Sequence, residues 1–139
     1  MGIKRIDGLL LEQIDNELLV FNQVTGEGHA LNETAARVFG LADGETSRAT
    51  ITAALSQQFN LPDDPDITEL AVSELRDAGL VTDDESQSSG INRRAVIRKL
   101  GLSVMAAAAL PLVETMVARP AYAQGSMGVT GITGDTGAP

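Results

Sequence analysis

The sequence has 139 residues, with 19 acidic and 10 basic side chains, one histidine, and neither cysteine nor tryptophan. These counts exclude disulfide scaffolds, cysteine nucleophiles, Cys/His zinc sites and catalytic triads with a spare histidine, and we expect no cofactor. The first 85 residues carry a net charge of −12, whereas residues 86–124 carry +4. Because an acidic front half repels phosphate, we expect no nucleic-acid partner.

Only the front of the chain, residues 1–82, has the patterning of a globular domain, and its length suffices for one modest core. Its three phenylalanines, Phe21, Phe39 and Phe59, are the expected anchors of that core. The run at 83–90 is polar throughout, which predicts a flexible linker. The remaining residues form two further segments, 91–124 and 125–139.

Three short strands are predicted near the start of the domain. The apolar runs Leu9–Ile14 and Glu17–Asn22 flank a tight hairpin turn at 15–16, and a third strand covers Glu27–Leu31. Together they predict a three-stranded antiparallel meander. Within it His29 is the one group that titrates near neutral pH, and we expect it as a partly exposed strand residue rather than a ligand.

Three helices are predicted to follow the strands. Asn32, Ser47 and Asp64 are their expected N-caps, and Pro65 after Asp64 strengthens the third start. The acids around Asp64 are interpreted as caps and a solvated helix start rather than a metal or acid–base site. A last extended piece at 80–82 is expected to return to the sheet. The predicted helices cover 33–41, 48–59, and a third that begins at 65 and ends at Gly79.

A family resemblance rests on particular residues in this order of elements. Residues 31–39 read Leu-Asn-Glu-Thr-Ala-Ala-Arg-Val-Phe, followed by Asp43-Gly44, a capped helix and Leu-Arg-Asp-Ala-Gly-Leu-Val at 75–81. Over residues 6–82 the chain resembles the PqqD family, and Leu-Asn-x-Thr-Ala is the more specific element. The resemblance implies an α+β, winged-helix-like fold and a non-catalytic adaptor that binds the leader peptides of ribosomally made precursors. It also implies a modifying enzyme as partner, of the radical SAM or another tailoring type.

The resemblance places the leader along the third predicted strand and against the third helix. There an added strand gains affinity from backbone hydrogen bonds. Small Gly28 and Ala30 are expected to let a peptide backbone approach, although the family commonly has bulkier residues there. Glu74 and Asp77 are expected either to meet basic leader residues at the rim of a groove or to be merely solvated. Leu70 is expected either at the floor of this groove or in the core. The candidate peptide-binding residues are Glu27, Gly28, His29, Ala30, Leu31, Ile67, Leu70, Ala71, Glu74 and Asp77.

The second segment opens with Asn-Arg-Arg-Ala-Val-Ile-Arg at 92–98, which resembles a twin-arginine export signal. The apolar stretch at 100–113 predicts a helix of 14 residues, about 21 Å long and shorter than a bilayer core of roughly 30 Å. A small-x-small pattern at 121–123 is typical of a cleavage site. A retained membrane anchor and a buried partner helix remain alternatives. The candidate export residues are Arg93, Arg94, Arg98, Ala121 and Ala123.

The last segment, 125–139, is five consecutive Gly-x-y triplets, a collagen-like tail with too little proline to hold a triple helix alone. Two functions fit this order of segments. In the first, the chain is an adaptor for a separate peptide, membrane-associated, with a cytoplasmic front domain and an extracytoplasmic tail. In the second, the chain is a self-carried precursor whose C-terminal segment leaves through a twin-arginine translocon after the front domain docks an enzyme.

Overall fold

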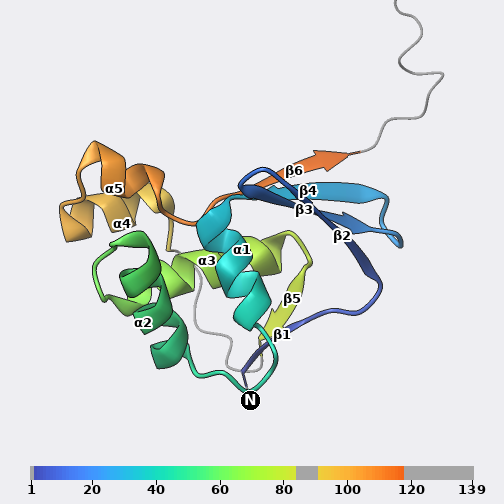
Figure 1. Ribbon diagram of the computed structural model, residues 1–139, viewed down its shortest axis with the longest axis horizontal. Coiled ribbons are helices and arrows are strands. Elements are labelled where there is room, and N and C mark those ends of the chain that lie inside the picture. The colour runs from blue at the N-terminus through green and yellow to red at the C-terminus, as the bar shows by residue number, and fades with distance from the viewer. Residues whose placement is uncertain (1, 84–90, 118–139) are drawn as a thin grey trace, which may run out of the picture.

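The computed structural model of the chain describes residues 2–83 and 91–117, and this part has the expected α+β class with antiparallel sheets. Figure 1 shows the main sheet along one side and the helices on the other. The Gly-x-y tail and residues 84–90 of the predicted linker lie outside the described residues.

Three helices form the centre of the front half, and each begins at the predicted cap. The side chains of Asn32, Ser47 and Asp64 accept hydrogen bonds from backbone N–H groups in the first helical turns. Such caps satisfy donors that a helix start leaves unpaired, which is why the boundaries were visible in the sequence. The helices are α1 (Glu33–Leu41), α2 (Arg48–Phe59) and α3 (Pro65–Asp77).

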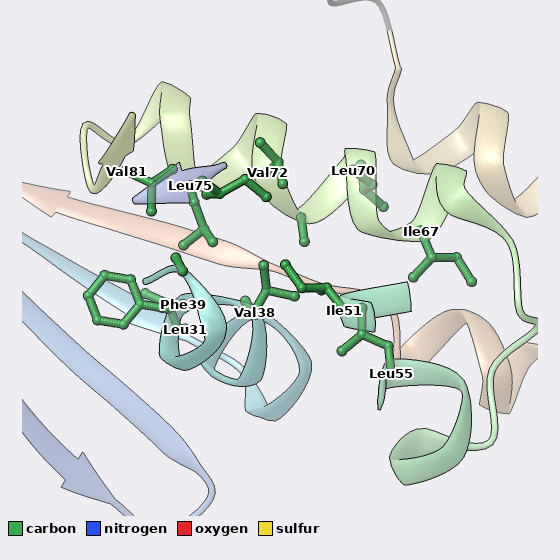
Figure 2. Packing of buried hydrophobic residues seen from close by; sticks show 14 of the residues in the cluster. Leu31, Val38, Phe39, Ile51, Leu55, Ile67, Leu70, Val72, Leu75 and Val81 are labelled. Atoms are coloured by element: carbon green, nitrogen blue, oxygen red, sulfur yellow. The ribbon is translucent and has the colours of Figure 1, made fainter. Parts of the chain in front are cut away.

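The core lies where these three helices meet. Figure 2 shows Val38 of α1, Ile51 and Leu55 of α2 and Leu75 of α3 pointing toward one another, and all four are at most 1% exposed. The expectation that all three phenylalanines anchor the core is wrong in one case: Phe39 is buried and Phe59 partly buried, but Phe21 is 39% exposed. Alternation along the strand explains this, because buried Val20 and Asn22 take the core face on either side of Phe21.

Four strands form the main sheet in the order β2-β3-β4-β6, and all neighbours are antiparallel. The first three are the predicted meander. The fourth comes from the C-terminal part of the chain, so the predicted three-stranded sheet was incomplete. Because β6 pairs with β4, the edge that the meander leaves free is covered. The strands are β2 (Leu9–Ile14), β3 (Glu17–Asn22), β4 (Glu27–Leu31) and β6 (Val113–Val117).

A separate two-stranded sheet joins β1 (Ile3–Arg5) to β5 (Val81–Asp83). The extended piece after α3 was expected to return to the main sheet, but it pairs with the start of the chain instead. Asp83, assigned to the linker, is the last residue of β5, and its carboxylate pairs with Arg48. Arg48 also lies 2.6 Å from Glu69, so one guanidinium ties α2, α3 and β5 together.

The predicted apolar helix over 100–113 does not form; two short helices and a strand take its place. The helix α4 (Arg93–Leu100) ends at Gly101, which adopts a left-handed φ of +62°. Ser103 then caps α5 (Val104–Ala108), and β6 begins two residues after Pro111. Among the helices of the described ranges, none is long and apolar enough to cross a membrane.

Candidate functional site

The predicted peptide-binding strand, β4, pairs with β6 along the edge that faces away from β3. The register runs from Glu27 opposite Val117 to Leu31 opposite Val113, so every residue of β4 has a partner in β6. In Figure 1 the two strands lie side by side at the upper edge of the sheet. The edge therefore takes an extended, antiparallel segment in the manner expected of a leader.

The backbone groups that face β6 follow from the alternation of an antiparallel ladder, in which every second pair exchanges hydrogen bonds. The N–H of Asn32 donates to the carbonyl of Leu112 at 3.1 Å, which sets the phase. Gly28 is not required for the approach, because a Cβ there would lie at an ordinary 3.9 Å from the nearest β6 atom. The next bonded pairs along the ladder are Ala30–Glu114 and Gly28–Met116.

Two side chains of the Leu-Asn-x-Thr-Ala element hold the backbone just before β6. The amide Nδ2 of Asn32 donates to the carbonyl of Leu110 at 2.8 Å, and its Oδ1 accepts from the N–H of Leu112 at 3.1 Å. The same Oδ1 also caps α1. Buried Thr34 donates through Oγ1 to the carbonyl of Ala109. The sequence identified Asn32 as a cap only and missed Thr34, since nothing local shows a partner some 75 residues away.

The helix α3 approaches the outer edge of β6 near Val113, the first residue of that strand. The Glu74 carboxylate accepts a hydrogen bond of 2.7 Å from the N–H of Val113, on the side that faces away from β4. Burial raises the pKa of the Glu74 carboxyl, while this hydrogen bond and the charge of Arg93 act to lower it. The expected rim acid therefore accepts a hydrogen bond from a backbone donor, and the nearby basic side chain is Arg93 of the same chain. A groove between helix and strand is lined by Glu74, Asp77, Ala78, Leu112, Val113 and Thr115.

His29 is a residue of β4 and lies opposite Thr115 of β6. It is only 1% exposed, so the expectation of a partly exposed residue was wrong. Its Nδ1 is 2.9 Å from the hydroxyl of Thr115, and its Nε2 is 3.7 Å from the carboxylate of Glu27. Burial lowers the pKa of the imidazole, against the opposing effect of Glu27. The neutral form thus fits the site, because a buried charge without a full partner is costly.

The remaining predicted site residues belong to the core rather than to an open groove. Their exposed fractions are at most 2%, so of the two interpretations of Leu70 the structure agrees with the core. These residues are part of the core cluster to which β4 and α3 both contribute. They are Leu31, Ile67, Leu70 and Ala71.

Arg93, the first arginine of the twin-arginine pattern, makes contacts within the chain. Its guanidinium donates to the carbonyls of Ala107 and Pro111, both at 2.9 Å, and so holds the turn that leads into β6. Further along α4, Lys99 pairs with Asp66 at the start of α3 at 2.5 Å. The segment is therefore fastened to the front half by polar contacts as well as by strand pairing.

Of the other candidate export residues, two lie in the part of the chain that the structure describes. Arg94 and Arg98 are exposed on α4, while Ala121 and Ala123 lie outside the described residues. Within residues 2–83 and 91–117, no group of histidine, aspartate and glutamate side chains is placed to hold a metal ion.

Comparison with known families adds to this geometry. Residues 17–81 match the family described as Coenzyme PQQ synthesis protein D (PqqD). This part of the chain belongs to the PqqD family. The PqqD match spans β3, β4 and the three helices, so β4 and α3, between which β6 lies, both belong to it, whereas α4, α5 and β6 lie beyond it. No curated protein and no solved structure matches the chain.

Proposed function

We propose that this PqqD protein is a peptide-binding adaptor that takes the leader of a ribosomally made precursor as an extra strand on β4. PqqD membership supports an adaptor for such precursors in general. The observation that carries the finer proposal is the pairing of β4 with an extended segment along its whole length. The adaptor then presents the rest of the precursor to a modifying enzyme, for which a radical SAM or another tailoring enzyme is the expected partner.

Strand addition explains how one groove accepts a peptide without a fixed sequence. The ladder on β4 and the bonds from Asn32, Thr34 and Glu74 are all made to backbone atoms. Affinity therefore comes from the main chain, and selectivity is left to the side chains that alternate toward and away from the core. The groove needs no reacting group for this task, and we propose no catalysis by the chain itself.

A display selection tests the proposal. The full chain with Glu114→Pro, which removes the β6 N–H that pairs with Ala30, is offered a random library of 20-residue displayed peptides. We expect enrichment of extended sequences with alternating apolar residues. Adding Ala30→Pro should abolish enrichment because it removes a β4 donor. The matched control Glu33→Pro should not, since proline is tolerated at the first helical position. Failure to enrich peptides, or enrichment indifferent to Ala30→Pro, would refute the proposal.

Export and membrane association form a second, separate proposal that rests on the arginine pattern alone. Arg94 is the residue suited to its test because it is exposed, whereas Arg93 holds backbone carbonyls. Replacing Arg94 by lysine keeps the charge and the fold but removes the specific pair. The tail beyond residue 117 is then expected to remain on the cytoplasmic side.

A further inference from the structure

The groove proposed for a leader holds a segment of this same chain. Residues 91–117 contain α4, α5 and β6, and β6 lies between β4 and the carboxylate of Glu74 on α3. The PqqD match ends at residue 81, before this segment begins. The segment therefore lies outside the part of the chain that matches the family, whereas β4 and α3 lie inside it.

The contacts that hold the segment are those a groove makes with a peptide. Asn32, Thr34 and Glu74 bind main-chain atoms of residues 109–113. Backbone-directed contacts of this kind recognise an extended chain whatever its side chains are. The motif that identifies the family thus contacts the added segment directly.

Two apolar side chains of the segment are fully buried, and other apolar residues of residues 91–117 pack partly buried against the core. Val96 and Leu110 are 1% and 0% exposed and join the core, whereas Val104 and Met105 between them are 88% and 85% exposed. A few buried anchors with exposed residues between them are typical of a bound peptide.

The charges of the two parts are complementary. Residues 91–117 carry four basic side chains and one acidic, against a net charge of −12 for the first 85 residues. The pair of Lys99 with Asp66 is one contact in which this complementarity is realised. Opposite charge favours encounter and correct register of the two parts.

We propose that residues 91–117 are the ligand of this groove, a leader carried in cis. The chain is then both adaptor and precursor, and the modifying enzyme acts on residues that follow β6 in the sequence. This inference rests on the proposed function, because it names the peptide that the groove recognises. A separate leader that displaces β6 is the competing outcome.

The experiment begins from the full chain with a protease site introduced at 84–90, cleaved after folding. The C-terminal fragment should stay associated with the front half after cleavage. It should exchange with an excess of fluorescently labelled synthetic peptide of residues 91–117, and fluorescence anisotropy follows that exchange. A peptide N-methylated at Glu114, whose N–H faces β4, should bind about tenfold more weakly, the effect of one lost backbone hydrogen bond that leaves a carbonyl unpaired. N-methylation at Thr115, whose N–H faces away from β4, is the matched control and should leave affinity unchanged.

The outcomes separate this inference from the proposed function. Loss of dispersed amide resonances from residues 2–83 on fragment release would make the segment a structural part of the fold and overturn the inference. A folded front half that binds peptides from the displayed library but not the 91–117 peptide would also overturn it, while leaving the adaptor function intact. A folded front half that binds neither would refute both.

Discussion

Replacing Asn32 tests whether the family motif holds the C-terminal segment or merely starts a helix. Its side chain makes three hydrogen bonds: one caps α1, and two bind the backbone of Leu110 and Leu112. A lost N-cap costs about 1 kcal/mol, and each lost hydrogen bond about 1 kcal/mol. We therefore expect Asn32→Ala to lower the free energy of unfolding by about 3 kcal/mol.

Asn32→Asp separates the two roles. The carboxylate keeps the cap and the acceptor for Leu112, but it loses the donor to Leu110, so about 1–2 kcal/mol is expected. Urea denaturation gives both values, and amide exchange reports where the loss occurs. In both variants the amide of Ala30, which faces β6, should exchange faster than in the parent. If Asn32→Ala lowered the free energy of unfolding by only about 1 kcal/mol and left the Ala30 amide protected from exchange, the side chain would act as a helix cap alone. It would then not hold the segment before β6.

Three further perturbations follow from the structure. Burial lowers the pKa of His29 below 6.5, so the unfolded chain takes up a proton there more readily than the folded chain. The free energy of unfolding should therefore fall as the pH drops below 6.5. In thermal melts from pH 7.5 to 5, His29→Phe should remove this slope. Arg48→Met removes the arginine that pairs with the buried carboxylate of Asp83. It should lower the free energy of unfolding in urea by about 1–3 kcal/mol, a value discounted for the partial exposure of the arginine. A loss below about 0.5 kcal/mol would contradict this expectation. Arg94→Lys should leave the melting temperature unchanged and trap a C-terminal reporter inside the cell, and unchanged export would exclude the twin-arginine route.

The elements from β2 to α3 were predictable because their signals are local. Asp15 takes a left-handed φ of +53° in the tight turn between β2 and β3, as such hairpins require. The caps Asn32, Ser47 and Asp64 each lie directly before the helix they begin. Signals of this kind need only a few neighbouring residues, so a single sequence reveals them.

The parts that failed depend on partners far along the chain. The pairing of β4 with β6 joins residues about 85 positions apart, and nothing in the run Val113–Val117 names its partner. The hydrogen bond between His29 and Thr115 follows from that pairing, as does the hydrogen bond from Val113 to Glu74. That Glu27–Leu31 has one side open to a further strand could nevertheless be predicted, because a three-stranded meander leaves that side unpaired.

The edge of β4 that the meander leaves free accepts the chain's own segment Val113–Val117 as a strand. His29 and Thr115 lie opposite each other in a pair that does not exchange backbone hydrogen bonds, where the two Cα atoms approach to about 4.5 Å. A nuclear Overhauser effect between their Hα protons in the full chain is the most direct measurement. We expect a strong effect. Its absence, with chemical shifts of an unstructured chain at Thr115 and rapid exchange of the Ala30 amide, would show that β6 does not pair with β4.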